Sequence, residues 1–389
     1  MRRTIALLLG LLCVGAGVGA ATSSTTPTAN GAQSSRALSL GIYDDAELFG
    51  HPSRGFATLE QLGVPLVRAT LRWGGGDHAV AHEQPEDGTD PADPAYDWGP
   101  FDEMLKRADA RGIEVLATIV GTPTWANEGK RPFVAPTDMD DLRDFATAAA
   151  TRYSGEFVPE GAEEPLPAVH RFLAWNEPNN PVFLRPQFKK VGRKYIVQSA
   201  VSYARICNAI SAGVHAVEDA DDTVACGATA PRGNNRARGP RPSVTPLVFL
   251  KALKKRGAQF DVYAHHPYYG APSETPATRL SSRSAVTLGN IGDLLATLKR
   301  LYGPSKHLWV TEYGYQTKPP DKSFGVTLRK QAKYLKQAYE IARRNRRIDV
   351  LIWFLMRDDR RVLQGWQSGL IRASGKKKPS FKTFSRLER

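Results

Sequence analysis

Short runs of apolar and β-branched residues alternate with longer amphipathic stretches along the chain from residue 38 onward. Each run has the length of a buried strand, and most runs are flanked by Gly, Pro, Asn or Asp. The runs lie at 39–43, 66–72, 114–120, 169–175, 223–229, 260–266, 307–313 and 349–355. The pattern therefore predicts eight buried strands.

Stretches with helical spacing of apolar residues lie between these runs. The stretch 100–111 opens with proline and places Phe101, Leu105 and Ala108 on one face. Further helical patterns lie at 138–153, 190–217, 245–256, 290–302 and 326–345. Strands that alternate with helices in this way are typical of a single (β/α)₈ TIM barrel, an α/β fold. No linker interrupts 38–389, so we expect one domain over these residues.

The N-terminal segment differs in composition from the rest of the chain. Arg2 and Arg3 precede a mostly apolar run over 5–19, and small residues follow it. This order predicts a secretory signal peptide over 1–21, with an uncleaved anchor as the alternative. Residues 22–37 are rich in Ser, Thr and Ala and are expected to form a flexible leader. We therefore expect a secreted protein, extracellular or associated with the cell envelope, without stable membrane insertion after signal cleavage.

Composition and charge narrow the classes of function. The chain has 389 residues, of which 41% are hydrophobic and 24% charged, and this excludes a disordered or fibrous protein. Neither the dinucleotide fingerprint Gly-x-Gly-x-x-Gly nor the phosphate-binding Gly-x-x-x-x-Gly-Lys is present, so nucleotide-binding folds lose support. The net charge of +14 would suit an anionic polymer, but no nucleic-acid reader motif accompanies it. We favour a solvated surface that faces the cell envelope and expect no nucleic-acid partner.

Two cysteines remain after the signal segment is removed, Cys207 and Cys226. They fit one disulfide in an oxidising compartment and fit equally well as small buried hydrophobic residues. No cluster of Cys and His has the spacing of a zinc site, so no structural zinc is expected.

Polar and aromatic side chains gather at the ends of the predicted strands. In a TIM barrel these carboxyl ends form the active-site face. The fourth run leads into Trp-Asn-Glu-Pro-Asn (175–179) and the seventh ends in Thr-Glu-Tyr-Gly (311–314), so Glu177 and Glu312 should face one mouth. Paired carboxyl groups, one protonated and one ionised, are what cleavage of a glycosidic bond requires. We expect the two groups to lie about 5–5.5 Å apart, and we expect the charge of Glu312, helped by apolar walls, to raise the pKa of Glu177.

These two motifs resemble the acid/base and nucleophile motifs of the retaining glycoside hydrolases of clan A. The chain is most similar to family 39-type enzymes and related bacterial exopolysaccharide endoglycosidases, and more distantly to family 5 cellulases. The segments Tyr-Asp-Trp (96–98) and Thr-Pro-Thr-Trp-Ala (122–126) also resemble those families. The resemblance covers 38–389 and implies a monomeric retaining glycosidase that acts on an extracellular or cell-wall polysaccharide or oligosaccharide, with no metal or organic cofactor.

The resemblance also implies roles for individual residues. Glu177 corresponds to the general acid/base and Glu312 to the nucleophile. Asn176 would bind the sugar 2-hydroxyl. Arg68 would hold the nucleophile ionised, and as a strand-end residue it should lie outside the core.

Four further residues complete the expected substrate site. His266 and Tyr268 correspond to a pair that lines the glycone subsite. Trp353 would supply an apolar platform for the sugar, and Trp125 is a second candidate for sugar contact. Packing in the protein interior is the alternative for both tryptophans, and also for Trp366. His265 is expected to be structural.

A non-catalytic carbohydrate-binding or cell-wall-associated TIM barrel is the main alternative function. Such a protein would keep aromatic surfaces and lose a carboxylate, whereas this sequence retains both glutamates together with Asn176 and Arg68. The basic stretch 231–242 contains four arginines that fit contact with an acidic sugar or phosphate, or simple solvation. We favour solvation slightly, and the sequence names no sugar or linkage.

Overall fold

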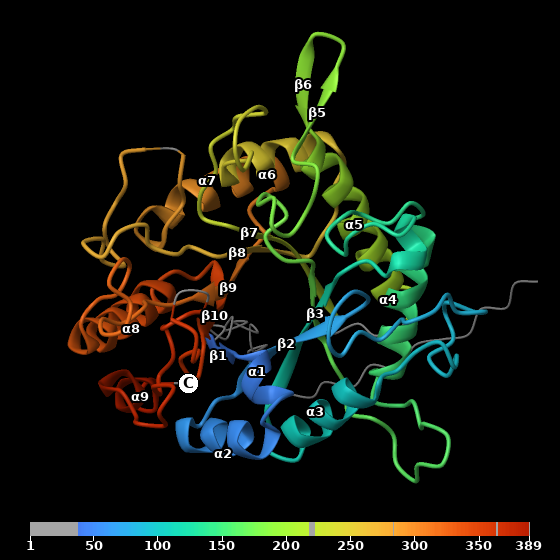
Figure 1. Cartoon of the computed structure of the whole chain (residues 1–389), viewed down its shortest axis with the longest axis horizontal. Helices are drawn as coiled ribbons and strands as arrows, with labels where there is room; N and C mark the ends of the chain where they lie inside the picture. Colours follow the sequence, from blue (N-terminus) through green and yellow to red (C-terminus); the bar gives the residue numbers. More distant parts are fainter. Residues whose placement is uncertain (1–37, 218–221, 283, 363–364, 389) are drawn as a thin grey trace, which may run out of the picture. The chain divides into compact units, whose positions relative to one another are not determined.

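The computed structural model describes residues 38–217, 222–282, 284–362 and 365–388. The predicted signal peptide (1–21) and leader (22–37) lie outside the described residues. Parallel strands form a closed barrel in the order β1-β10-β9-β8-β7-β4-β3-β2, surrounded by helices (Figure 1). The predicted (β/α)₈ barrel is thereby confirmed. The barrel strands are β1 (Ser39–Tyr43), β2 (Leu66–Arg72), β3 (Glu114–Val120), β4 (Arg171–Ala174), β7 (Thr223–Thr229), β8 (Val262–His265), β9 (Leu308–Tyr313) and β10 (Ile348–Phe354).

Helices between the strands cover the outside of the barrel. They are α1 (Asp45–Leu48), α2 (Pro52–Leu62), α3 (Gly99–Asp109), α4 (Asp140–Arg152), α5 (Gln198–Val214), α6 (Pro246–Lys255), α7 (Ile291–Tyr302), α8 (Leu328–Arg343) and α9 (Pro379–Phe384), with short 3₁₀ turns η1 (Thr124–Asn127) and η2 (Leu288–Asn290). Helix α2 was not predicted, although Pro52 starts it and Gly63 ends it in the left-handed conformation. No helix of the described residues is long and apolar enough to cross a membrane.

The predicted helix over 190–217 is correct only from Gln198 onward. Residues 188–197 instead form a hairpin of β5 (Phe188–Val191) and β6 (Lys194–Val197), which projects from the barrel wall in Figure 1. Gly192 adopts a φ of 57° in the two-residue turn, a conformation that suits glycine and closes a hairpin. Because the hairpin is largely exposed, little apolar packing was available to stabilise a helix there.

The barrel interior changes from apolar to polar toward the site. Leu66 and Leu116 point inward and belong to an apolar cluster that fills the barrel. Two positions further along the same strands, Arg68 and Thr118 are also buried. Because side chains on a strand alternate between its faces, these polar residues form the next layer of the same interior.

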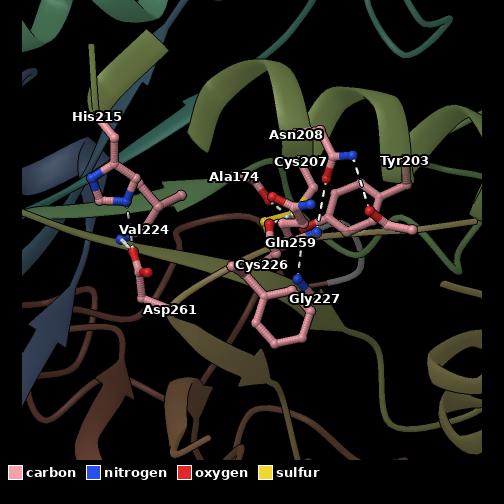
Figure 2. Close-up of a disulfide and its surroundings, with 12 residues drawn as sticks. Ala174, Tyr203, Cys207, Asn208, His215, Val224, Cys226, Gly227, Gln259 and Asp261 are labelled. Carbon is pink, nitrogen blue, oxygen red and sulfur yellow. Dashed lines mark hydrogen bonds and ion pairs between the residues drawn. A yellow bond between two sulfur atoms is a disulfide. The ribbon is translucent and has the colours of Figure 1, made fainter. Parts of the chain in front are cut away.

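A disulfide between Cys207 and Cys226 joins α5 to β7 (Figure 2). Beside it, the hydroxyl of Tyr203 donates to the carbonyl of Ala174 over 2.7 Å and accepts the Gly227 N–H over 2.6 Å. Ala174 is the last residue of β4, so α5 holds the strand end from which the Trp-Asn-Glu motif continues. The sequence left open whether these cysteines form a disulfide or are buried as free thiols, and in the structure they form the disulfide.

Candidate active site

Glu177 stands on a tight backbone turn at the end of β4. Trp175 and Glu177 have φ angles of 64° and 38°, in the left-handed region that non-glycine residues rarely adopt. The buried indole N–H of Trp175 donates to the carbonyl of Phe183 over 2.7 Å, and the backbone N–H of Glu177 donates to Ala228 over 2.9 Å. These contacts fix the turn and direct the Glu177 carboxyl group into the mouth of the barrel.

The Glu177 carboxyl group is enclosed, with 12% of its side chain exposed. Its Oε1 lies 3.1 Å from His266 Nδ1, and its Oε2 accepts an N–H from Asn180 over 2.9 Å. Burial raises the pKa of Glu177 to about 7, while the Asn180 hydrogen bond and the charge of Arg68 act in the opposite direction. The expectation that Glu312 would be the main cause of this raised pKa is wrong, because the dominant cause is desolvation.

Glu312 lies in β9 and faces Glu177 across the mouth. Its Oε1 accepts an N–H from Arg68 over 2.8 Å, and its Oε2 accepts the hydroxyl of Tyr268 over 3.0 Å. Both oxygens of the carboxylate are therefore held by donors. This arrangement suits an ionised group kept in one orientation.

Arg68 is 1% exposed and connects several residues of the site. Its guanidinium donates to Glu312, to Asn176 Oδ1 over 2.8 Å and to Thr118 Oγ1 over 2.9 Å, and it lies 4.3 Å from the ring centre of Tyr43. The expectation that Arg68 would lie outside the core is wrong, because the barrel interior itself is polar at this level. Since Asn176 accepts through Oδ1, its Nδ2 is the atom available to donate to a ligand.

His266 is fully buried between the two glutamates. Its Nε2 lies 3.0 Å from Thr311 Oγ1 and 3.5 Å from Arg68 Nη1. Arg68 only donates, so Nε2 is the acceptor nitrogen and Nδ1 carries the hydrogen that faces Glu177. Burial lowers the pKa of His266 to about 4, so the ring is neutral at pH 7.

His265 has a structural environment, as the sequence analysis expected. Its ring contacts Thr229 Oγ1 at 2.8 Å and the carbonyl of Val286 at 3.0 Å, and burial lowers its pKa to about 3. The adjacent histidines thus point to different surroundings, and His266 is the one that reaches the carboxylates.

A pocket of about 990 Å³ opens above the two glutamates. One oxygen of Glu177, one oxygen of Glu312 and a ring nitrogen of His266 all lie within 4.8 Å of one another. Aromatic and apolar side chains make much of the wall. The lining includes Tyr43, Val182, Phe183, Tyr268, Tyr269, Phe324, Phe354, Val362 and Trp366.

The structure brings six of the eight predicted site residues together and leaves two tryptophans outside the pocket. The six are Arg68, Asn176, Glu177, His266, Tyr268 and Glu312. Trp353 is 3% exposed and its indole N–H donates to Ser368 O, so it packs in the core and does not fit the role of a sugar platform. Trp125 packs edge-on against Trp73, also away from the pocket.

Sequence reasoning missed two residues that the pocket presents. Trp366 is 42% exposed and stacks on Tyr268 with 5.6 Å between ring centres. Asn180 holds the Glu177 carboxyl group. Asn180 follows the Trp-Asn-Glu-Pro-Asn motif directly, which is a usable signal, whereas Trp366 lies in a long loop that has no motif.

Among the described residues, one group of acidic and histidine side chains is close enough to share a metal ion, and it is Glu177, His266 and Glu312. Each of these three side chains already has hydrogen-bond partners within the protein. The Arg68 guanidinium on Glu312 would also repel a cation at this position.

A family model described as "Glycosyl hydrolase catalytic core" matches residues 162–384, more than half of the chain. The chain belongs to this family. The interpretation of the chain as a glycosyl hydrolase is thereby confirmed. The match covers the segment that holds Asn176, Glu177, His266, Tyr268 and Glu312.

Solved glycoside hydrolase structures share the fold of this glycosyl hydrolase at low sequence identity. A family 39 glycoside hydrolase from Bacteroides cellulosilyticus WH2 has 18% identity and a TM-score of 0.60. A glucosidase from Croceicoccus marinus has 15% identity and a TM-score of 0.65. The match covers 90% of this chain in both cases, and 63% and 65% of those chains.

Fungal β-1,4-galactanases also share the fold, with 15% identity and a TM-score of 0.58. Here the match covers 90% of this chain and the full length of the galactanase. A comparison with curated proteins found no match.

Proposed function

We propose that this glycosyl hydrolase is a secreted retaining glycosidase that cleaves O-glycosidic bonds of an extracellular or cell-wall polysaccharide by double displacement. The observation that carries the mechanism is the approach of Glu177 and Glu312 oxygens within 4.8 Å. Retaining enzymes hold their carboxyl groups about 5–5.5 Å apart, whereas inverting enzymes need roughly 6.5–9.5 Å to admit a water. The short distance favours direct attack by one carboxylate.

In the first step Glu312 is the nucleophile and Glu177 the acid. An oxygen of Glu312 forms a bond to the anomeric carbon while the bond from that carbon to the leaving oxygen breaks. The raised pKa of Glu177, about 7, means that its proton is available to the leaving oxygen near neutral pH. Arg68 and Tyr268 hold the attacking carboxylate in line.

In the second step Glu177 is the base. Its carboxylate takes a proton from water, the water oxygen bonds to the anomeric carbon, and the bond between that carbon and Glu312 breaks. Two inversions give net retention. The free Nδ2 of Asn176 suits a hydrogen bond to the sugar hydroxyl next to the reacting carbon, and the neutral His266 helps to hold Glu177 in both steps.

Aromatic side chains at the pocket mouth support a carbohydrate ligand. Tyr268 and Trp366 stack on each other, and Trp366 presents an exposed face toward the pocket. Flat apolar faces of this kind suit the C–H faces of sugar rings. We propose Trp366 as the sugar platform of this site, in place of Trp353.

Two features support secretion. The first 21 residues have the order of a signal peptide. The Cys207–Cys226 disulfide is a bond that persists in oxidising compartments such as the extracellular space. We further propose that the enzyme works as a monomer, with the polysaccharide or a derived oligosaccharide as its partner, and needs no cofactor for these steps.

A panel of soluble and insoluble glycans, read by the mass of released products, tests the proposal. The wild-type enzyme should release sugars from at least one polymer, and the Glu177→Ala and Glu312→Ala variants should each lose most of that release. Asp321→Asn is a matched control, because Asp321 lines the pocket but caps only backbone N–H groups of its own loop. Full activity of either glutamate variant on a polymer would overturn the mechanism.

A further inference from the structure

Two segments beside the pocket carry basic residues and no acidic ones. One is the hairpin β5–β6, and the other is the loop 231–242 between β7 and α6. We call their exposed cationic residues the basic wall. Its members are Lys189, Lys190, Arg193, Lys194, Arg236, Arg238 and Arg241.

The two segments form one surface. Arg238 Nε donates to the hydroxyl of Tyr195 in the hairpin over 3.1 Å, and its guanidinium lies 5.6 Å from the centre of that ring. Buried Asn179 ties the Glu177 loop to the basic loop, since its side chain bonds the backbone of Ala230 and Val244. The basic wall is therefore anchored next to the catalytic turn.

The wall also reaches into the pocket. Arg241 is among the residues that line it, and so is Arg232. Arg232 is neutralised by Glu274 at 3.1 Å, whereas no member of the basic wall forms an ion pair with any of the described residues. The hairpin lysines lie beyond the pocket lining, so the positive surface extends outward from the mouth.

Charge elsewhere on the protein is partly arranged differently, although the exposed Arg329, Lys333 and Lys336 on α8 also form no ion pair with the described residues. On α8, Arg343 and Arg344 both approach Glu340, as is usual for a solvated helix face. The segment 74–98, between β2 and α3, contains acidic residues and no Lys or Arg. Uncompensated like charges repel one another, so a cluster that is kept unpaired beside a binding site suits a ligand that brings the opposite charge.

We propose that the basic wall binds acidic groups of the substrate, so that this enzyme acts on an anionic polysaccharide whose sugars carry carboxylate or phosphate groups. The proposal rests on the proposed function and adds the substrate class to it. Because the wall extends beyond the pocket, it contacts sugars that flank the cleaved bond. The wall therefore contributes to affinity for a polymer and adds little to the chemical step on a small glycoside.

Binding is measured with a catalytically inactive Glu177→Gln background, so that the polymer stays intact. The probes are polygalacturonate, its carboxyl-reduced neutral form, and poly(glycerol phosphate), with duplex DNA as a separate arm. The wall variants are R236Q/R238Q/R241Q and K189Q/K190Q. The matched control is R329Q/K333Q/K336Q on α8, which removes three exposed positive charges from another side of the barrel.

The proposal expects at least about tenfold tighter binding of one anionic polymer than of the neutral form at low salt. Each wall variant should lose most of this difference, and the α8 control should keep it. Comparison of polygalacturonate with poly(glycerol phosphate) decides whether the wall binds carboxylate or phosphate groups. Equal losses of binding in the wall variants and the α8 variant would mean that net charge alone attracts the polymer, and this would overturn the proposal. The proposal would also be overturned if duplex DNA bound as tightly as the two anionic polymers.

The outcome separates this proposal from the proposed function. If the wild-type enzyme hydrolyses a neutral glycan and the wall variants do so equally well, retaining hydrolysis stands and the anionic substrate class falls. If no glycan is hydrolysed while an anionic polymer binds through the wall, the wall stands as a binding surface for acidic polymers and retaining hydrolysis falls. Unfolding temperatures of all variants check that the fold is intact.

Discussion

Arg68 Nη1 lies 2.8 Å from Oε1 of Glu312, inside a barrel layer where the arginine is almost completely buried. The same guanidinium orients Asn176 through a second N–H. One side chain thus fixes two residues that face the substrate. A buried ion pair of this kind is costly to break. Removal of one partner leaves the other charge buried and unpaired, which lowers the free energy of unfolding by about 3–5 kcal/mol.

Arg68→Lys should therefore lower kcat by about 100-fold or more while leaving much of the stability, because lysine keeps the charge but lacks the fork that reaches Glu312 and Asn176 together. Arg68→Met should lower both kcat and the unfolding temperature. The measurements are steady-state kinetics and thermal unfolding. Arg152→Lys is the matched control, because Arg152 pairs with Asp102 at 2.6 Å away from the pocket and should change stability alone. Wild-type kcat in Arg68→Lys would remove Arg68 from the site.

The alkaline limb of the activity profile should lie near pH 7. Burial raises the pKa of Glu177 to about 7, and the enzyme loses its acid once that proton leaves. A pH profile of kcat/KM on a substrate with a poor leaving group measures this limb. Glu177→Ala should abolish it. Asp44→Asn is the control, because burial also raises the pKa of Asp44 to about 7 but this residue caps backbone groups. The limb should survive in that variant.

Glu177 should also make the fold less stable as pH rises. Its folded pKa lies above the unfolded value of 4.5, so the folded state holds the proton more tightly. The resulting stability is present below pH 4.5 and is lost as pH rises to about 7, by at most about 3 kcal/mol. Glu177→Gln should therefore raise the unfolding temperature more at pH 8 than at pH 4. An equal change at both values would show that the carboxyl group is not desolvated.

Trp366→Ala should raise KM for the polymer by about tenfold and change kcat on a small aryl glycoside little, because it removes a stacking surface at the mouth. Trp353→Phe is the matched comparison. It removes a buried indole and its hydrogen bond to Ser368, so it should lower the unfolding temperature with a smaller effect on KM. The reverse pattern would restore Trp353 as the platform.

Loss of the disulfide should lower stability by about 3 kcal/mol, since Cys207 and Cys226 are separated by 19 residues and their link restricts the unfolded chain. The C207A/C226A variant should unfold roughly 5 °C or more below wild type. Thiol titration under denaturing conditions should find no free thiol at either position in the wild-type protein. Two titratable thiols there would contradict the pairing.

The sequence predicted the barrel well because its strands are buried and their runs are rich in apolar and β-branched residues. It also brought together Glu177 and Glu312, since motifs mark the carboxyl ends of β4 and β9, and all these ends face one mouth of a barrel. It placed a helix over 190–197 because lysine-rich segments carry little periodic signal, and the glycine turn decided the outcome. Trp353 was predicted as the sugar platform in place of Trp366, because the sequence pattern indicates which residues lie on a strand but does not indicate the path of a loop.

The cause of the raised pKa of Glu177 could not be predicted from the sequence either. Two glutamates in one mouth suggest repulsion between charges. In the structure Arg68 neutralises Glu312, so enclosure of the Glu177 carboxyl group becomes the larger effect. Burial of a particular atom depends on packing by loops such as the one that holds Asn180, and packing of this kind leaves no periodic pattern.

The first product released should keep the anomeric configuration of the substrate. One oxygen of Glu177 and one oxygen of Glu312 lie within 4.8 Å of each other, and this short approach favours a retaining geometry over one that admits a water between Glu312 and the anomeric carbon. Glu312 must then attack the carbon itself, and water follows from the same face after the leaving group departs. Proton NMR of the product at early time, before mutarotation, reads the configuration directly. An inverted product would mean that Glu312 activates water.

A fluorosugar that traps the glycosyl-enzyme gives an independent measurement. The sugar's mass should appear on the peptide that contains Thr311, Glu312 and Tyr313, because the attacking oxygen belongs to Glu312. Glu312→Gln is the control and should take up no label, since an amide is a poor nucleophile. Glu177→Gln should still be labelled when the reagent has a good leaving group, because no proton is then needed in the first step. Labelling of any other carboxylate would move the nucleophile and leave the barrel unchanged.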